Sequence, residues 1–136
     1  MKVVVDTNVI ISAFAARGLC AEIFEVCLLE HTIILSDHIL AEVAKALLKK
    51  IRVPLAVQQD ILRYLKENAV VVKPEKLPKS VCRDKNDDAI IGTAIASGAS
   101  YSITGDEDLL SLKIYKSITI ITPRQFWHIA RQSHQK

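Results

Sequence analysis

The fold follows from one stretch, Lys2-Val3-Val4-Val5-Asp6-Thr7-Asn8, in which a short β-branched strand runs directly into an acid. Further apolar runs predict strands at residues 32–35, 69–72, 101–104 and 118–122. Helical spacing of apolar residues predicts helices at residues 8–16, 19–27, 37–48, 54–67, 87–97 and 123–132. Strands that alternate with helices indicate an α/β fold.

The predicted architecture is a single domain over residues 1–136, a three-layer α/β/α sandwich around a parallel sheet. Its strands are continuously apolar, as expected where helices cover both faces of a sheet. In such sheets the functional crevice lies beyond the carboxyl ends of the strands. Acids that follow strands are therefore the first candidates for chemistry.

The composition limits the classes of protein to which the chain can belong. Half of the residues are hydrophobic, the net charge is +3 and the pI is about 8.8, which is compatible with a polyanionic partner without requiring one. Cys20, Cys27 and Cys82 lack metal-ligand spacing, and an odd count indicates reduced thiols in the cytoplasm. No apolar run is long enough to span a membrane, and an acid at position 6 argues against a secretory signal. We expect a cytoplasmic protein with no membrane segment.

Two acids stand directly at the ends of predicted strands. Asp6 ends the first strand, and Asp106 follows the fourth in Thr104-Gly105-Asp106. If these strands pair, both carboxylates share one crevice. Taken singly, each acid is equally well explained as a helix N-cap or a turn residue.

A third acid, Asp87, opens the predicted helix 87–97 on its apolar side. At about 100° per residue, the apolar residues of this helix form one arc on its surface, made of Ile90, Ile91, Ala94 and Ile95. Asp87 falls near the middle of that arc, where an unpaired buried carboxylate costs several kcal/mol or becomes neutral. A bound cation would remove this cost, and an N-cap is the alternative.

A fourth acid, Glu42, lies at the margin of the apolar stripe of helix 37–48, where a solvated glutamate is the ordinary expectation. It follows the second strand by less than two turns and can therefore reach the same edge of the sheet. Several carboxylates that converge there would repel one another unless a divalent metal is bound. Oxygen ligands suit Mg²⁺ or Mn²⁺ better than Zn²⁺, and paired hard cations are widely used to cleave phosphodiesters.

These acids and their surroundings form an ordered set. Its members are Val4-Val5-Asp6-Thr7-Asn8, Ser36 with Glu42, Asp87 with Ile90, Ile91 and Ala94, and Thr104-Gly105-Asp106-Glu107-Asp108-Leu109-Leu110. The set resembles the PIN-domain nucleases, and within them the VapC-like toxins of type II toxin–antitoxin pairs. The resemblance covers residues 2–126.

The resemblance implies a five-stranded parallel sheet in the order 3-2-1-4-5 and a Mg²⁺- or Mn²⁺-dependent endoribonuclease. It also implies RNA as substrate, a homodimer and a cognate antitoxin. The matching catalytic and metal-binding positions are Asp6, Glu42, Asp87 and Asp106. The matching supporting positions are Asn8, Thr104 and Asp108, the last also a substitute ligand. Asp84 or Asp88 could replace Asp87, although the helical face favours Asp87.

RNA binding requires positive charge near the acids. Arg83 and Lys85 immediately precede Asp87, and four basic residues run along and past the helix that carries Glu42, namely Lys45, Lys49, Lys50 and Arg52. Lys49 is equally well explained as a favourable charge at a helix C-terminus.

Other α/β classes fit less well. A haloacid dehalogenase-type phosphatase needs an acid at position 8, which is Asn8, and nucleotide binding needs a Gly-rich loop that the chain lacks. The rival from another class is a catalytically silent PIN-like module that binds RNA or a protein.

Overall fold

The computed structural model describes residues 1–82 and 85–134, with the backbone alone at 85–86 and 133–134. The strands are β1 (Lys2–Val5), β2 (Thr32–Ser36), β3 (Val70–Val72), β4 (Tyr101–Ile103), β5 (Ile114–Tyr115) and β6 (Ile118–Ile121). The helices are α1 (Thr7–Ala15), α2 (Leu19–Glu30), α3 (Asp37–Lys49), α4 (Leu55–Asn68), α5 (Lys85–Ser97), α6 (Glu107–Leu110) and α7 (Pro123–His134). None of the helices in this part of the chain is long and apolar enough to cross a membrane.

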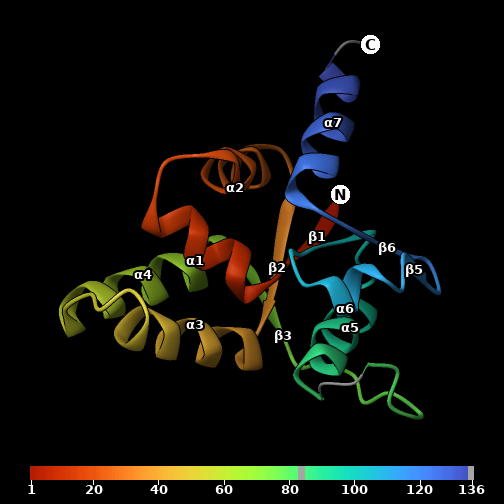
Figure 1. The fold of residues 1–136 in the computed structure, drawn as a ribbon, viewed down its shortest axis with the longest axis horizontal. Helices are drawn as coiled ribbons and strands as arrows, with labels where there is room; N and C mark the ends of the chain where they lie inside the picture. Colours follow the sequence, from red (N-terminus) through yellow and green to blue (C-terminus); the bar gives the residue numbers. More distant parts are fainter. Residues whose placement is uncertain (83–84, 135–136) are drawn as a thin grey trace.

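The strands form one sheet in the order β3-β2-β1-β4-β6-β5. Helices α1 to α4 lie on one side of it and α5 and α6 on the other (Figure 1). Five strands are parallel, which confirms the predicted α/β class and the predicted strand order. The strand count was wrong by one, because β5 adds an antiparallel edge to β6.

The extra strand is too short to leave a periodic signal, since it has only two residues. Its connection to β6 is a tight turn in which Lys116 takes a left-handed backbone conformation, with φ of 53°. Glycine or asparagine usually marks such a position in a sequence. Because this position is a lysine, the sequence gives no signal for the hairpin.

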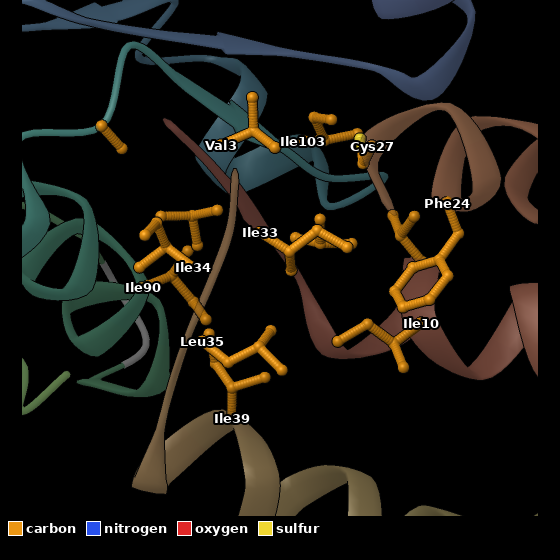
Figure 2. Close-up of a cluster of buried hydrophobic side chains, with 14 of the residues drawn as sticks. Val3, Ile10, Phe24, Cys27, Ile33, Ile34, Leu35, Ile39, Ile90 and Ile103 are labelled. Carbon is orange, nitrogen blue, oxygen red and sulfur yellow. The ribbon is translucent and has the colours of Figure 1, made fainter. Parts of the chain in front are cut away.

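The core lies on both faces of the sheet. Alternate residues of β2 point to opposite sides, so that Ile33 faces Ile10 and Phe24 while Ile34 faces Ile90 of α5 (Figure 2). All five of these side chains are buried. Packing on both faces explains why the strands are continuously apolar. It also holds α1 and α5 on opposite faces of the sheet, next to the same end of the strands.

That edge is the carboxyl end of the parallel strands. The N–H of Asp6 donates to the carbonyl of Ile103 at 3.0 Å, and the N–H of Thr104 donates to the carbonyl of Ile121 at 3.0 Å. The ladder therefore extends one residue beyond β1 and β4. Asp6 and Thr104 are held side by side where the strands end.

Candidate active site

The centre of the site is the pair formed by Asp6 and Thr104, both buried. One oxygen of Asp6 accepts from the N–H of Thr7 at 2.7 Å, which makes Asp6 the N-cap of α1. The other oxygen accepts from the hydroxyl of Thr104 at 2.7 Å. The same hydroxyl oxygen accepts from the N–H of Asp106 at 3.0 Å. One threonine thus links the acids that follow β1 and β4.

Glu42 reaches this edge from α3. Ser36 at the end of β2 caps that helix, with Oγ accepting from the N–H of Ile39 at 3.1 Å. One turn further, Oε1 of Glu42 accepts from the hydroxyl of Thr7 at 3.1 Å and lies 3.4 Å from Nε2 of His38. Thr7 therefore connects the glutamate of α3 to the start of α1.

Three aspartates form the tightest acidic group among the described residues. Carboxylate oxygens of Asp87, Asp106 and Asp108 lie within 4.8 Å of one another. Asp106 also caps α6, where Oδ1 accepts from the N–H of Asp108 at 2.8 Å. Asp108, expected from the sequence as a supporting residue or a substitute ligand, thus lies among the central acids.

The four predicted acids, Asp6, Glu42, Asp87 and Asp106, line one pocket of about 490 Å³. Its other lining residues are Thr7, Asn8, Lys45, Ala46, Lys49, Lys50 and Ile90. Two supporting positions contact these acids, because the hydroxyl of Thr104 donates to Asp6 and the N–H of Asp108 donates to Asp106. The structure therefore brings together acids that are far apart in the sequence.

The electrostatics of the pocket disfavour a further negative charge. Burial raises the pKa of Asp6, and the charges of Glu42 and Asp106 raise it further, although the hydrogen bonds from Thr104 and Thr7 oppose the shift. Burial and negative charge also change the pKa of the Cys82 thiol. Burial, followed by the charges of neighbouring aspartates, raises the pKa of Cys82 to about 12. The thiol is therefore protonated and unreactive at neutral pH.

Asp88 has a structural task that the sequence did not show. Its carboxylate accepts from the hydroxyl of Ser80 at 2.5 Å and from the N–H groups of Val81 and Cys82 at 3.1 and 2.9 Å. It thereby anchors the end of loop 73–82 to the first turn of α5. These contacts make Asp88 a poor substitute for Asp87 as a ligand.

The same loop is anchored to α5 a second time, at Gly92. The N–H of Glu75 donates to the carbonyl of Gly92 at 3.0 Å, and a Cβ at position 92 would lie 2.2 Å from the carbonyl oxygen of Glu75. Only glycine permits this approach. Asp84 and Arg83, together with the side chain of Lys85, lie outside the described residues.

Sequence reasoning missed two features of the site. Thr7 was not singled out, although a polar residue directly after a strand-end acid is a usable signal. Lys45 and Lys50 were named only as positive charges along the helix that carries Glu42, because the depth of the pocket along α3 is not visible in the sequence. The predicted contact Lys49 does line the pocket.

The fold and the site define an α/β protein with an acidic pocket at the carboxyl edge of its sheet. A sequence profile described as PIN domain matches residues 2–108, which include every predicted acid. The uncharacterised protein MJ1680 of Methanocaldococcus jannaschii is 37% identical over 119 residues, covering 83% of this chain and 76% of the relative. This chain belongs to the PIN domain family.

A solved structure has the same fold. A chain in the crystal structure of VapBC2 from Rickettsia felis, bound to a DNA fragment from their promoter, superposes with a TM-score of 0.63. The sequences are 15% identical, and the match covers 90% of this chain and 98% of the other. At that identity the likeness supports the fold and says nothing of individual residues.

Proposed function

We propose that the protein is a metal-dependent endoribonuclease that hydrolyses phosphodiester bonds at the acidic pocket. The observation that carries the proposal is the lining of one pocket by Asp6, Glu42, Asp87 and Asp106. A cluster of this kind at the carboxyl edge of a parallel sheet lies where such folds carry their chemistry. Membership of the PIN domain family supports a nuclease.

The donor set fits Mg²⁺ or Mn²⁺. The oxygens of Asp87, Asp106 and Asp108 within 4.8 Å of one another offer the hard ligands that these cations prefer. Burial, and to a smaller extent the charges of Glu42 and Asp106, raises the pKa of Asp6, and a bound cation would stabilise its charged form. Asp87 and Asp106 would hold the metal, with Asp6 and Glu42 completing the site and Asp108 as a further donor. When bound, the metal would supply an activated water and neutralise charge on the phosphate.

The remaining side chains orient the acids. Thr104 holds one oxygen of Asp6, so that this carboxylate keeps a single rotamer in the pocket. Thr7 holds Glu42 in the same way. Asn8 is exposed at the pocket wall, where its amide can donate to a phosphate oxygen or a water molecule.

We further propose that this nuclease is the toxin of a toxin–antitoxin pair, acting on RNA as a homodimer in the cytoplasm. The fold shared with a chain of VapBC2 supports an antitoxin partner. The three free cysteines, Cys20, Cys27 and Cys82, suit a reducing compartment. Co-expression with the product of a small adjacent open reading frame should suppress both the cleavage and any growth arrest.

The test of the enzyme is cleavage of a mixed RNA pool with Mg²⁺, with Mn²⁺ and with a chelator, followed by mapping of the ends. Wild type should cleave only with metal, and Asp6→Asn should be inactive. The matched control is Asp60→Asn, which removes an exposed acid on α4 and should cleave like wild type. A wild type that binds RNA without cutting it under any metal condition would favour the silent binding module instead.

A further inference from the structure

One wall of the active-site pocket is basic. Lys45, Lys49 and Lys50, from the second half of α3 and its C-cap, line the same pocket of about 490 Å³ as the acids. All three side chains are exposed. The pocket therefore has a negative end at the sheet edge and a positive side along α3.

None of these three lysines forms an ion pair with a carboxylate among the described side chains. Lys45 lies one turn after Glu42, but the Oε1 atom of Glu42 contacts the hydroxyl of Thr7 and the ring of His38. Among the described side chains, the ion pairs are His38–Glu42 and Arg63–Asp60, so none of the three lysines is neutralised. The helix dipole explains Lys49 and Lys50 at the C-terminus, but it does not explain Lys45 in the middle of α3.

The spacing of the lysines suits a chain of phosphates. Glu42, Lys45 and Lys49 stand at positions i, i+3 and i+7 and share one face of α3. A rise of about 1.5 Å per residue puts the backbone of Lys49 about 10 Å beyond that of Glu42. Adjacent phosphates of one strand are closer together than this distance, so the row of lysines can contact more than one phosphate.

We propose that a single strand of nucleic acid runs along α3, from the carboxylates toward the C-terminal end of the helix. Lys45, Lys49 and Lys50 bind its phosphates on one side of the cleaved bond. The pocket of about 490 Å³ has the volume of a small-molecule site, which suits one strand of nucleic acid better than a duplex. The inference rests on the proposed function, because the acids mark the point of cleavage.

The test compares three variants, Lys45→Gln, Lys49→Gln and Lys50→Gln, with Lys66→Gln as control. Lys66 is an exposed lysine on α4 outside this pocket, and its loss changes the net charge equally. Fluorescence anisotropy measures the binding of a labelled single strand of about 12 nucleotides in EDTA, from about 50 to 200 mM KCl. Each measurement is made once with RNA and once with DNA of the same sequence.

Each pocket variant should reduce the steepness of log K against log salt by about 0.7, while Lys66→Gln retains the wild-type slope. The loss should be the same for every sequence, because phosphate contacts do not read bases. Equal slopes for the pocket variants and Lys66→Gln would overturn the inference, whether or not the protein cleaves RNA. A lysine-dependent slope without cleavage under any metal condition would leave this surface standing and overturn the nuclease instead.

Discussion

The substitution Thr104→Val tests most directly whether the hydroxyl of Thr104 holds the acids of the pocket in place. Valine keeps the shape of the buried side chain and removes only the hydroxyl. That hydroxyl donates to Asp6 at 2.7 Å and accepts from the N–H of Asp106 at 3.0 Å. A hydrogen bond to a charged group contributes about 1.5–3 kcal/mol and a neutral one about 1 kcal/mol, so we expect a loss of about 2–4 kcal/mol at neutral pH.

The loss should depend on pH in a defined direction. Burial raises the pKa of Asp6, and the hydrogen bond from Thr104 opposes that shift. A raised folded pKa gives stability that is fully present below the unfolded pKa of about 4 and is lost as pH rises through the folded value. Without the hydroxyl the pKa rises further and more stability is lost. The difference between wild type and Thr104→Val should therefore be smallest in acid and grow toward neutral pH.

The assay is urea unfolding in EDTA at several pH values, with Thr104→Ser as the matched control. Serine keeps the hydroxyl and loses one methyl group, which should cost about 0.5–1.5 kcal/mol at every pH. In the cleavage assay Thr104→Ser should retain activity and Thr104→Val should lose most of it. A valine variant as stable as the serine variant, or a difference that does not change with pH, would refute the role assigned to the hydroxyl.

Three further predictions concern the charge and the scaffold of the site. Mg²⁺ or Mn²⁺ at about 100 times its Kd should stabilise the protein by about 2.7 kcal/mol and raise Tm by several degrees in a thermal melt; an unchanged melt up to millimolar metal would count against the site. Asp6→Asn should keep the fold, lose cleavage and unfold at higher urea than wild type in EDTA at neutral pH, and this gain should shrink as pH falls toward the unfolded pKa. Gly92→Ala should be less stable by about 1–3 kcal/mol, because overpacking against the carbonyl of Glu75 exceeds the gain of about 1 kcal/mol in helix propensity. Its control is Gly105→Ala, where a Cβ meets nothing within 4 Å, and urea unfolding that shows no difference between the two alanine variants would contradict the close packing.

The predictability of the site differed from residue to residue. Asp6 could be placed because the end of a parallel strand is a position that sequence alone defines. Asp87 could be placed because a helical face is periodic, and the side chain is 8% exposed as that face requires. Asp88 could not be interpreted, because its partners lie in a loop that has no periodic signal and returns from β3.

The same limit explains the lysines and the extra strand. Lys45 has an ordinary sequence context, and only the packing of α1 and α5 around the sheet edge makes its face of α3 a pocket wall. The β5–β6 hairpin has a lysine at a turn position where glycine would have given a signal. Local patterns are therefore sufficient for the strands and helices, and the order of the strands in the sheet followed from the resemblance to the PIN-domain nucleases. Contacts between distant segments require the structure.

The way in which the acids are held bears on how the site can work. Asp6, Glu42 and Asp106 accept from hydroxyl and backbone N–H groups, and Glu42 also lies 3.4 Å from the ring of His38. No lysine or arginine among the described side chains forms an ion pair with these three acids. A lysine salt bridge would lower the pKa of Asp6, but it would also compete with a metal for the same oxygens. Neutral donors orient the carboxylates and leave their charge available. Because the unpaired lysines stand along α3 instead, the positive charge of this pocket is free to bind a phosphate chain while the negative charge is free to bind the cation.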